Sequence, residues 1–448
     1  ISFFCNSSIA QEGDQKYYQP TDSLVKKKLE WWQGIKFGLL MHWGTYSQWG
    51  IVESWSLCPE DEGWCERRGP YSKNYSEYKR AYEDLIKTFN PVGFDPLKWA
   101  KAAKEAGMKY VVFTTKHHDG FCMFDTKQTD YKITNPVCPF SSNSKSNVAK
   151  EIFDAFRSEG LGIGAYFSKP DWHCSDYWDP YFPPFDRNPN YDLKKYPEKW
   201  NRYKDFTFNQ IKELMTEYGN VDILWLDGGW VQPMTQTSPR WGKNPVDQDI
   251  DMPKIAIMAR GLQPGLIIVD RAVEGNYQNY LTPEQQLPTK ALPYPWETCM
   301  TMATSWSYVP NDIYKPTREL IHLLCKIVSR GGNFLLNVAP GPNGDFDQIA
   351  YDRLKEIGAW MKVNGDAIYG TKPISPYQSG NVVFTAKEEN IYVIYLVNEG
   401  EKFLPETIAL KGLSVPKGSK ISIFGASKTL RYTIKDNVIE VEIPSIYR

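Results

Sequence analysis

Short apolar runs alternate with longer amphipathic segments over the first 365 residues of the chain. Each apolar run has the length of a strand buried on both faces, and it ends at polar or charged residues. This alternation predicts a parallel sheet surrounded by helices, in the form of an irregular (β/α)8-like barrel over residues 21–365. The predicted strands are 37–43, 110–114, 163–168, 221–227, 266–270, 301–308 and 333–338, and the predicted helices are 21–32, 75–89, 96–106, 147–159, 198–218, 252–260, 316–329 and 349–363.

The pattern changes after Tyr369, where short alternating runs broken by Gly and Pro replace the helix-length periods. Residues 391–397 (IYVIYLV) are typical of these runs, so residues 366–448 are predicted to form a C-terminal β-sandwich. At the other end, Ile1–Ala10 resembles the last part of a secretory signal, with small residues before a cleavage point. We therefore interpret residues 1–20 as a signal remnant and N-terminal extension, and expect a secreted or periplasmic protein.

The predicted strand 221–227 stands out because it stops abruptly at a carboxylate followed by two glycines. In an α/β barrel, the residue at the carboxyl end of a strand lies at the mouth, where the active sites of this fold are found. Asp227 has this place, between Trp225 and Trp230, and Gly228 allows a sharp turn after it. The alternative is that Asp227 only caps the next element. The flanking aromatic residues favour a functional carboxylate.

The composition excludes several classes of partner. A net charge of −1 argues against nucleic acid and anionic membrane surfaces, and no run of 18 apolar residues offers a membrane span. The aromatic share of 15% suits a site that stacks on sugar rings, although a large aromatic core would account for most of it. The eight cysteines lack CxxC spacing, and Cys58 with Cys65 is the most plausible disulfide in an oxidising compartment.

Three of the five histidines lie at the ends of predicted strands: His42 at the end of the first, and His117 and His118 after the second. Histidines that converge at one end of a barrel suggest a polar pocket. Three histidines and an acidic residue can also make a zinc or iron site. Adjacent residues of an extended chain point in opposite directions, which disfavours joint ligation by His117 and His118. We therefore predict no metal and no other cofactor.

Carboxyl groups are the remaining source of chemistry, and glycoside hydrolysis needs two of them beside the bond that is cleaved. Asp227 is the first candidate. The second has to come from another loop at the same end of the barrel, and the residues alone do not rank Glu53, Glu274, Glu284 and Glu297. No GxSxG, P-loop or GxGxxG motif followed by a helix is present, which argues against a serine nucleophile, phosphoryl transfer and dinucleotide chemistry.

Several motifs, in order along the chain, resemble those of glycoside hydrolase family 29, the α-L-fucosidases. They cover roughly residues 31–363, and the β-rich end fits the second domain of that family. The most specific are Tyr110–Phe121 (YVVFTTKHHDGF) and Leu224–Gly228 (LWLDG). The others are Lys36–Gly38, His42–Gly44, Tyr46–Ser47, Tyr166–Ser168, Arg271, Trp296–Glu297, Gly331–Asn333 and Leu336–Asn337.

The resemblance implies an exo-acting enzyme that removes terminal α-L-fucosyl residues from oligosaccharides or glycoconjugates, with retention of configuration through double displacement. It makes Asp227 the nucleophile and, from its position relative to Arg271 and Trp296, Glu284 the acid/base. The implied substrate contacts are His42, Glu53, Trp55, His117, His118, Tyr166, Trp225, Arg271, Glu297 and Trp306, with Trp306 against the fucose methyl group.

One segment departs from the family pattern, which often has Glu and Trp adjacent after the first strand. Here Ser54 separates Glu53 from Trp55, so that either Glu53 shifts to serve the sugar or its contact is lost. Relaxed preference among related galacto-configured sugars is therefore one alternative. A catalytically silent sugar-binding protein is another, and Asp227 speaks against it. The long aromatic loop at 171–196 is predicted to lie over the site, because structureless loops of this length are usually functional.

Overall fold

The computed structural model describes residues 16–61, 65–237, 242, 244, 246–416, 418–426 and 428–448. Seven parallel strands form a curled central sheet in the order β5-β4-β3-β2-β1-β7-β6. Every residue of these strands is buried, which explains why the sequence shows continuous rather than alternating apolar runs. The strands are β1 (Phe37–Met41), β2 (Tyr110–Lys116), β3 (Gly162–Ser168), β4 (Ile223–Asp227), β5 (Ile267–Asp270), β6 (Glu297–Thr301) and β7 (Asn333–Asn337).

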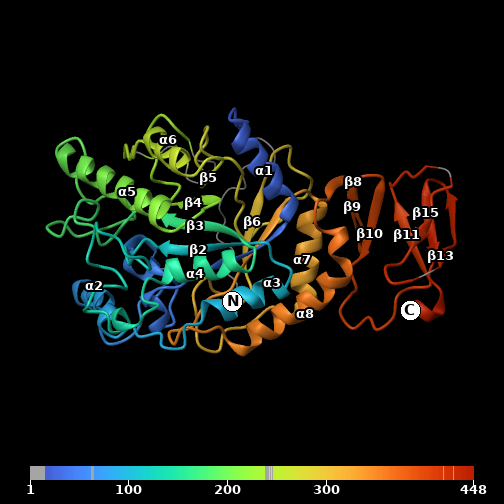
Figure 1. Ribbon diagram of the computed structural model, residues 1–448, viewed down its shortest axis with the longest axis horizontal. Coiled ribbons are helices and arrows are strands. Elements are labelled where there is room, and N and C mark those ends of the chain that lie inside the picture. The colour runs from blue at the N-terminus through green and yellow to red at the C-terminus, as the bar shows by residue number, and fades with distance from the viewer. Residues whose placement is uncertain are drawn as a thin grey trace.

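Helices surround this sheet (Figure 1), which confirms the predicted fold class. Asp22 caps the first helix, because its Oδ1 accepts the backbone N–H groups of Leu24 at 2.7 Å and Val25 at 3.3 Å. The second helix is shorter than predicted and continues as a 3-10 turn. The helices are α1 (Ser23–Ile35), α2 (Tyr75–Glu83), α3 (Pro96–Glu105), α4 (Val148–Ser158), α5 (Pro197–Glu217), α6 (Met252–Leu262), α7 (Thr317–Ser329) and α8 (Gln348–Asn364).

The sixth strand is not where the sequence predicts it. β6 covers Glu297–Thr301, whereas the predicted strand was 301–308. Glu297 interrupts the apolar pattern at the start of this strand, yet it is fully buried, because its carboxyl group accepts hydrogen bonds from Tyr110 and Trp225. A polar residue that is bonded inside a core has no signature in the apolar periodicity, so the pattern alone misplaced the strand.

An irregular segment, residues 277–285, lies between β5 and β6 and takes the place of an eighth strand. We call it the closing segment. It explains why the sequence offers only seven strand candidates for a barrel. Its position has a direct consequence for the chemistry, because it carries Glu284. The backbone bonds that hold it run from Asp270 N–H to the Tyr277 carbonyl (3.1 Å) and from Asn279 N–H to the Ile268 carbonyl (3.0 Å) beside β5, with bridges of Leu281 to Trp296 and Glu284 to Cys299 beside β6.

Antiparallel strands follow α8 at one end of the molecule (Figure 1) and form the predicted sandwich. Adjacent residues of β9 serve two cores: Phe384 packs in the sandwich with Leu410, whereas Val383 packs with the barrel core. We propose that the domain boundary falls near residue 366, between α8 and β8. The strands are β8 (Lys372–Ser379), β9 (Val382–Lys387), β10 (Asn390–Tyr395), β11 (Thr407–Lys411), β12 (Ile421–Ser422), β13 (Thr429–Leu430), β14 (Tyr432–Lys435) and β15 (Val438–Glu442).

Two other expectations concern the ends and the cysteines. The predicted signal remnant falls on residues 1–15, which lie outside the described residues, and on a short segment after them. Within the described ranges, no helix is long and apolar enough to cross a membrane. Cys58 and Cys65 are free and buried, so the predicted disulfide is absent. Burial, and then the neighbouring Asp61, raise the pKa of the Cys58 thiol, which disfavours the thiolate needed for disulfide formation.

The contact between α3 and α8 generates a test of the packing. A Cβ added at Gly358 would lie 2.2 Å from the backbone oxygen of Glu105, so we expect Gly358→Ala to lower the free energy of unfolding by about 1–3 kcal/mol. Gly261→Ala on α6 is the matched control, because nothing lies within 4 Å of its Cβ and alanine favours the helix. Denaturant unfolding measures both changes, and equal midpoints for the two variants would contradict the packing.

Candidate active site

Asp227 is the last residue of β4 and is almost fully buried. Its Oδ2 accepts a hydrogen bond from the Tyr166 hydroxyl at 2.5 Å, and its Oδ1 lies 3.0 Å from the guanidinium of Arg271. Gly228 follows with a φ of 89°, the left-handed turn that the sequence predicts, and its N–H donates to Oδ1 at 2.7 Å. Burial acts to raise the pKa of Asp227, but Arg271, His118 and Tyr166 together hold it well below its usual value. The carboxylate is therefore ionised.

Glu284 shares the guanidinium of Arg271 with Asp227. Arg271 directly follows β5, and one of its terminal nitrogens contacts Asp227 while the other contacts Glu284 on the closing segment. The backbone N–H of Gln285 donates to the carbonyl of Cys299 at 3.0 Å, which secures this part of the segment to β6. Of the four candidate second carboxylates, Glu284 is thus the one that shares an ion-pair partner with Asp227.

The ring of Trp225 packs against both Arg271 and Tyr166. The guanidinium of Arg271 lies 5.1 Å from its ring centroid, a cation–π contact, and the ring of Tyr166 stacks on it at 5.1 Å. Its Nε1 donates to Glu297 at 3.2 Å, and the hydroxyl of Tyr110 donates to the same carboxyl group at 2.5 Å. Glu297, which the resemblance makes a substrate contact, is 0% exposed and is bonded to Trp225 and Tyr110 inside the barrel.

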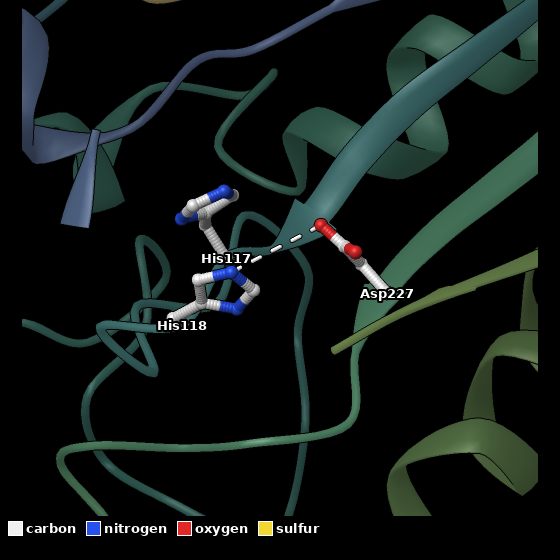
Figure 2. A group of neighbouring side chains, drawn as sticks. All are labelled: His117, His118 and Asp227. Atoms are coloured by element: carbon white, nitrogen blue, oxygen red, sulfur yellow. Dashed lines mark ion pairs between the residues drawn. The ribbon is translucent and has the colours of Figure 1, made fainter. Parts of the chain in front are cut away.

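The three predicted pocket histidines converge near Asp227. His118 Nε2 lies 3.9 Å from Asp227 Oδ2, and Figure 2 shows the rings of His117 and His118 side by side across from the carboxylate. Their centroids are 4.2 Å apart, so the expectation that adjacent histidines point apart is wrong. The reason is that β2 ends at Lys116 and the chain turns there. Burial lowers the pKa of His42 to about 4 and that of His118 to about 3, which keeps both rings neutral.

This convergence also bears on a metal. Ligand atoms of His117, His118 and Asp227 lie within 4.8 Å of one another, so their spacing could hold a cation. Both oxygens of Asp227 already have partners, and the Arg271 guanidinium lies 3.0 Å away. A fixed positive charge at this distance opposes a second cation. The charge of Arg271, and not the direction of the histidines, therefore disfavours a metal at this position.

The Glu53–Trp55 run reaches three parts of the pocket. Glu53 is 1% exposed, and burial, followed by the charges of Glu284 and Asp227, raises the pKa of its carboxyl well above the usual value. Ser54 Oγ lies 2.6 Å from Nδ1 of His117. The sequence did not predict this contact, although Ser54 is the residue that interrupts the Glu-Trp pair of the family pattern. Trp55 lies edge-to-face against His118 with centroids 5.0 Å apart.

The remaining predicted features lie around the histidines. The ring of Trp306 is 5.3 Å from that of His42. The loop at 171–196 packs against the pocket through Trp172, whose ring is 5.2 Å from that of His118. Arg187 of the same loop lies 5.3 Å from the ring centroid of Trp55. Long-range partners such as Asn337, which bonds His42, carried no signal in the sequence beyond their place in a motif.

A buried strand-end carboxylate, coupled through one arginine to a second carboxylate and lined by neutral histidines and aromatic rings, defines a glycoside hydrolase site on a barrel. A family model described as "Alpha-L-fucosidase" matches residues 4–366. The chain belongs to the α-L-fucosidase family.

Individual relatives agree with this assignment over nearly the whole chain. An α-L-fucosidase of Branchiostoma floridae is 27% identical and aligns with 96% of this chain and 92% of its own length. The solved α-L-fucosidase isoenzyme 1 of Paenibacillus thiaminolyticus is 32% identical with a TM-score of 0.75, covering 94% of this chain and 96% of the other. A Bacteroides thetaiotaomicron structure, described as a trapped covalent intermediate of a family 29 α-L-fucosidase with 2-fluoro-fucosyl fluoride, is 25% identical with a TM-score of 0.73 and covers 96% and 95%.

The buried Glu297 generates a prediction about pH. Burial raises its pKa from 4.5 to about 7, so the folded state binds the proton more tightly than the unfolded state. Stability from this group is then present below about pH 4.5 and is lost as the pH rises through about 7. Gln keeps the shape and cannot titrate, so we expect Glu297→Gln to gain about 3 kcal/mol of unfolding free energy over wild type between pH 4.5 and 8.

The measurement is denaturant unfolding of both proteins across this pH range. Glu30→Gln, an exposed position on α1, is the control and should follow wild type at each pH. A difference between Glu297→Gln and wild type that does not change with pH would show that Glu297 is ionised throughout.

Proposed function

We propose that the protein hydrolyses terminal α-L-fucosyl residues of oligosaccharides or glycoconjugates with retention of configuration, with Asp227 as nucleophile and Glu284 as acid/base. The observation that carries the residue assignment is the Arg271 guanidinium, which contacts both carboxylates. A retaining enzyme needs its two carboxyl groups about 5–5.5 Å apart, nearer than an inverting one, and a single guanidinium keeps them close. The family supplies the sugar.

In the first step, an oxygen of Asp227 attacks the anomeric carbon while Glu284 gives its proton to the departing oxygen. In the second step, Glu284 takes a proton from water, the water oxygen bonds to the anomeric carbon, and the bond to Asp227 breaks. Arg271 and Tyr166 keep the nucleophile ionised before attack. The first step needs the protonated form of Glu284, and the second step needs its carboxylate.

The pocket residues divide by position. His42, His117, His118, Tyr166 and Trp306 form one connected group of rings next to Asp227, and we assign them to the sugar. Trp55 lies against the His118 ring of this group, and we assign Trp55 and the buried Glu53 to the same sugar, with Arg271 and Trp225 supporting the nucleophile. A catalytically silent sugar-binding protein is not favoured, because it would not require two carboxylates coupled in this way.

We also propose that the protein is secreted or periplasmic. Support comes from relatives in rat and human, 27% and 25% identical, which are named plasma α-L-fucosidases. The signal-like composition of residues 1–10 agrees with this proposal. Fractionation of the producing cells, with immunodetection of the protein, tests it.

The nucleophile assignment predicts that Asp227→Ala lowers kcat on an aryl α-L-fucoside by at least ~10³, because the covalent route is removed. Asp222→Asn, an aspartate just before the same strand, is the matched control and should remain active. A 2-fluoro-fucosyl fluoride reagent should label Asp227 alone, as peptide mass spectrometry would show. A near-wild-type kcat for Asp227→Ala, or label on another residue, would end this assignment.

The acid/base assignment predicts a dependence on the leaving group. Glu284→Gln should slow cleavage of fucosides with poor leaving groups by about 10²–10⁴ and hardly affect the first step with good ones. Added azide should restore the second step of this variant by replacing activated water, with fucosyl azide as product. Glu274→Gln and Glu297→Gln are the controls and should show neither effect. If azide instead restored the activity of Glu297→Gln, the acid/base role would belong to Glu297 and not to Glu284.

Metal dependence is tested by chelation. We expect dialysis against a strong chelator to leave aryl fucosidase activity unchanged, because Arg271 already neutralises Asp227. Loss of activity that zinc restores would make His117 and His118 metal ligands. Metal analysis of the dialysed protein is the control for complete removal.

A further inference from the structure

Two pocket histidines, His42 and His117, each have Nδ1 held by a polar side chain from elsewhere in the chain. His42 Nδ1 lies 2.8 Å from Oδ1 of Asn337, and His117 Nδ1 lies 2.6 Å from Oγ of Ser54. In a neutral imidazole one nitrogen donates and the other accepts, so the role of Nδ1 determines what Nε2 offers to a ligand. The second bond of each partner decides that role.

Asn337 can only accept from His42. Its Nδ2 donates to the backbone carbonyl of Trp306 at 2.7 Å, and because a carbonyl cannot donate, this bond determines which end of the amide is the nitrogen. Oδ1 therefore faces His42, and the proton of that bond belongs to His42 Nδ1. Burial keeps this ring neutral, with a pKa of about 4. Nε2 of His42 is consequently a bare acceptor.

Ser54 has the opposite effect on His117. Its Oγ accepts the backbone N–H of Asp119 at 2.9 Å, and its side chain is fully buried. Within the described residues, the hydroxyl proton has no acceptor other than His117 Nδ1. If Nδ1 carried the proton, Ser54 would be left with an unpaired buried donor, which is costly. Burial, and then the neighbouring histidines, hold the pKa of His117 well below its usual value, so its single proton is on Nε2.

We propose that Ser54 and Asn337 are positioning residues that hold His117 and His42 in opposite tautomers, so that the pocket presents one Nε2–H donor and one bare Nε2 acceptor. The two rings lie edge-to-face with centroids 5.5 Å apart, and both neighbour Tyr166, which bonds the nucleophile. Within the described residues, neither Nε2 has a hydrogen-bond partner. One hydroxyl of the sugar accepts from His117, and another donates to His42. The identity of this ligand rests on the proposed function.

This polarity makes a distinction that a general sugar pocket would not make. A C–F group accepts weakly and cannot donate, whereas a C–H group does neither. At the hydroxyl bound by His117, fluorine should therefore be tolerated better than hydrogen. At the hydroxyl bound by His42, the two replacements should be equally poor, because neither can donate.

The first test measures inhibition of aryl fucoside cleavage by free L-fucose and by its deoxy and deoxyfluoro analogues at C2, C3 and C4. Free sugars are used because their binding does not depend on bond cleavage. In wild type, deoxygenation at each bound position should weaken inhibition by about 3- to 10-fold, the value of a neutral hydrogen bond. Fluorine should recover part of this loss at one position and none at another.

Ser54→Ala should abolish the difference between fluorine and hydrogen at the His117 position and leave the His42 position as in wild type. Ser54→Thr retains the hydroxyl and should restore the difference. An equal loss for every analogue in Ser54→Ala would show that Ser54 is merely structural and would overturn the proposal.

The second test needs no ligand and does not depend on a Ser54 variant. Nitrogen NMR of wild-type protein labelled with ¹⁵N-histidine reports which ring nitrogen carries the proton. The chain has five histidines, so the spectrum contains few signals. His117 should be protonated at Nε2 and His42 at Nδ1, with the signals assigned by single His→Gln variants. The same tautomer for both rings would overturn the proposal, even if Ser54→Ala failed to fold. If the tautomers are as expected but fucose does not inhibit, the proposed function is contradicted, whereas the tautomer assignment is still supported.

Discussion

The guanidinium of Arg271 is the group on which the rest of the site depends. It contacts Asp227 at the end of β4 and Glu284 on the closing segment, and it rests on the ring of Trp225. These charged groups are partly or fully buried. A lone carboxylate buried in this way would lose its solvation by water without compensation. Arg271 removes that penalty for both acids at once. The carboxylate that we propose as nucleophile can therefore be ionised inside an apolar barrel, and the proposed acid/base contacts the same guanidinium.

Burial favours the neutral forms of the other ionisable groups of the pocket, in contrast to Arg271 and its two carboxylate partners. Burial keeps His42, His117 and His118 neutral, because it lowers the pKa of each ring by more than the nearby charge of Asp227 raises it, and burial also raises the pKa of the Glu53 and Glu297 carboxyl groups. The site thus contains one positively charged side chain, Arg271, between two carboxylates, and neutral hydrogen-bonding groups surround them. Such an arrangement suits a substrate that is itself uncharged and rich in hydroxyl groups, with charge developing only at the reacting carbon.

The closing segment connects the fold to this chemistry. A regular eighth strand would hold its residues by a continuous ladder of backbone bonds, whereas residues 277–285 are joined to β6 by isolated bridges. Glu284 therefore comes from backbone that is less restrained than that of Asp227, which ends a fully paired strand. This difference agrees with the two proposed roles, because a nucleophile has to be fixed while an acid/base serves two successive steps.

The sequence by itself determined the alternation of strands and helices, the change to antiparallel strands after α8, and the place of Asp227 at a strand end. These features follow from the order of apolar and polar residues and from local signals such as Asp22 and Gly228, which act on their neighbours along the chain. Motifs then indicated the family, and comparison confirmed it.

Only the tertiary structure decided which glutamate shares Arg271 with Asp227, where β6 begins, that the rings of His117 and His118 lie side by side, and that Glu297 is bonded to Trp225. Each of these depends on groups that are far apart in sequence, such as His42 and Asn337, which are 295 positions apart. A buried polar group is stable only where its partner happens to fold, and no local pattern records that partner.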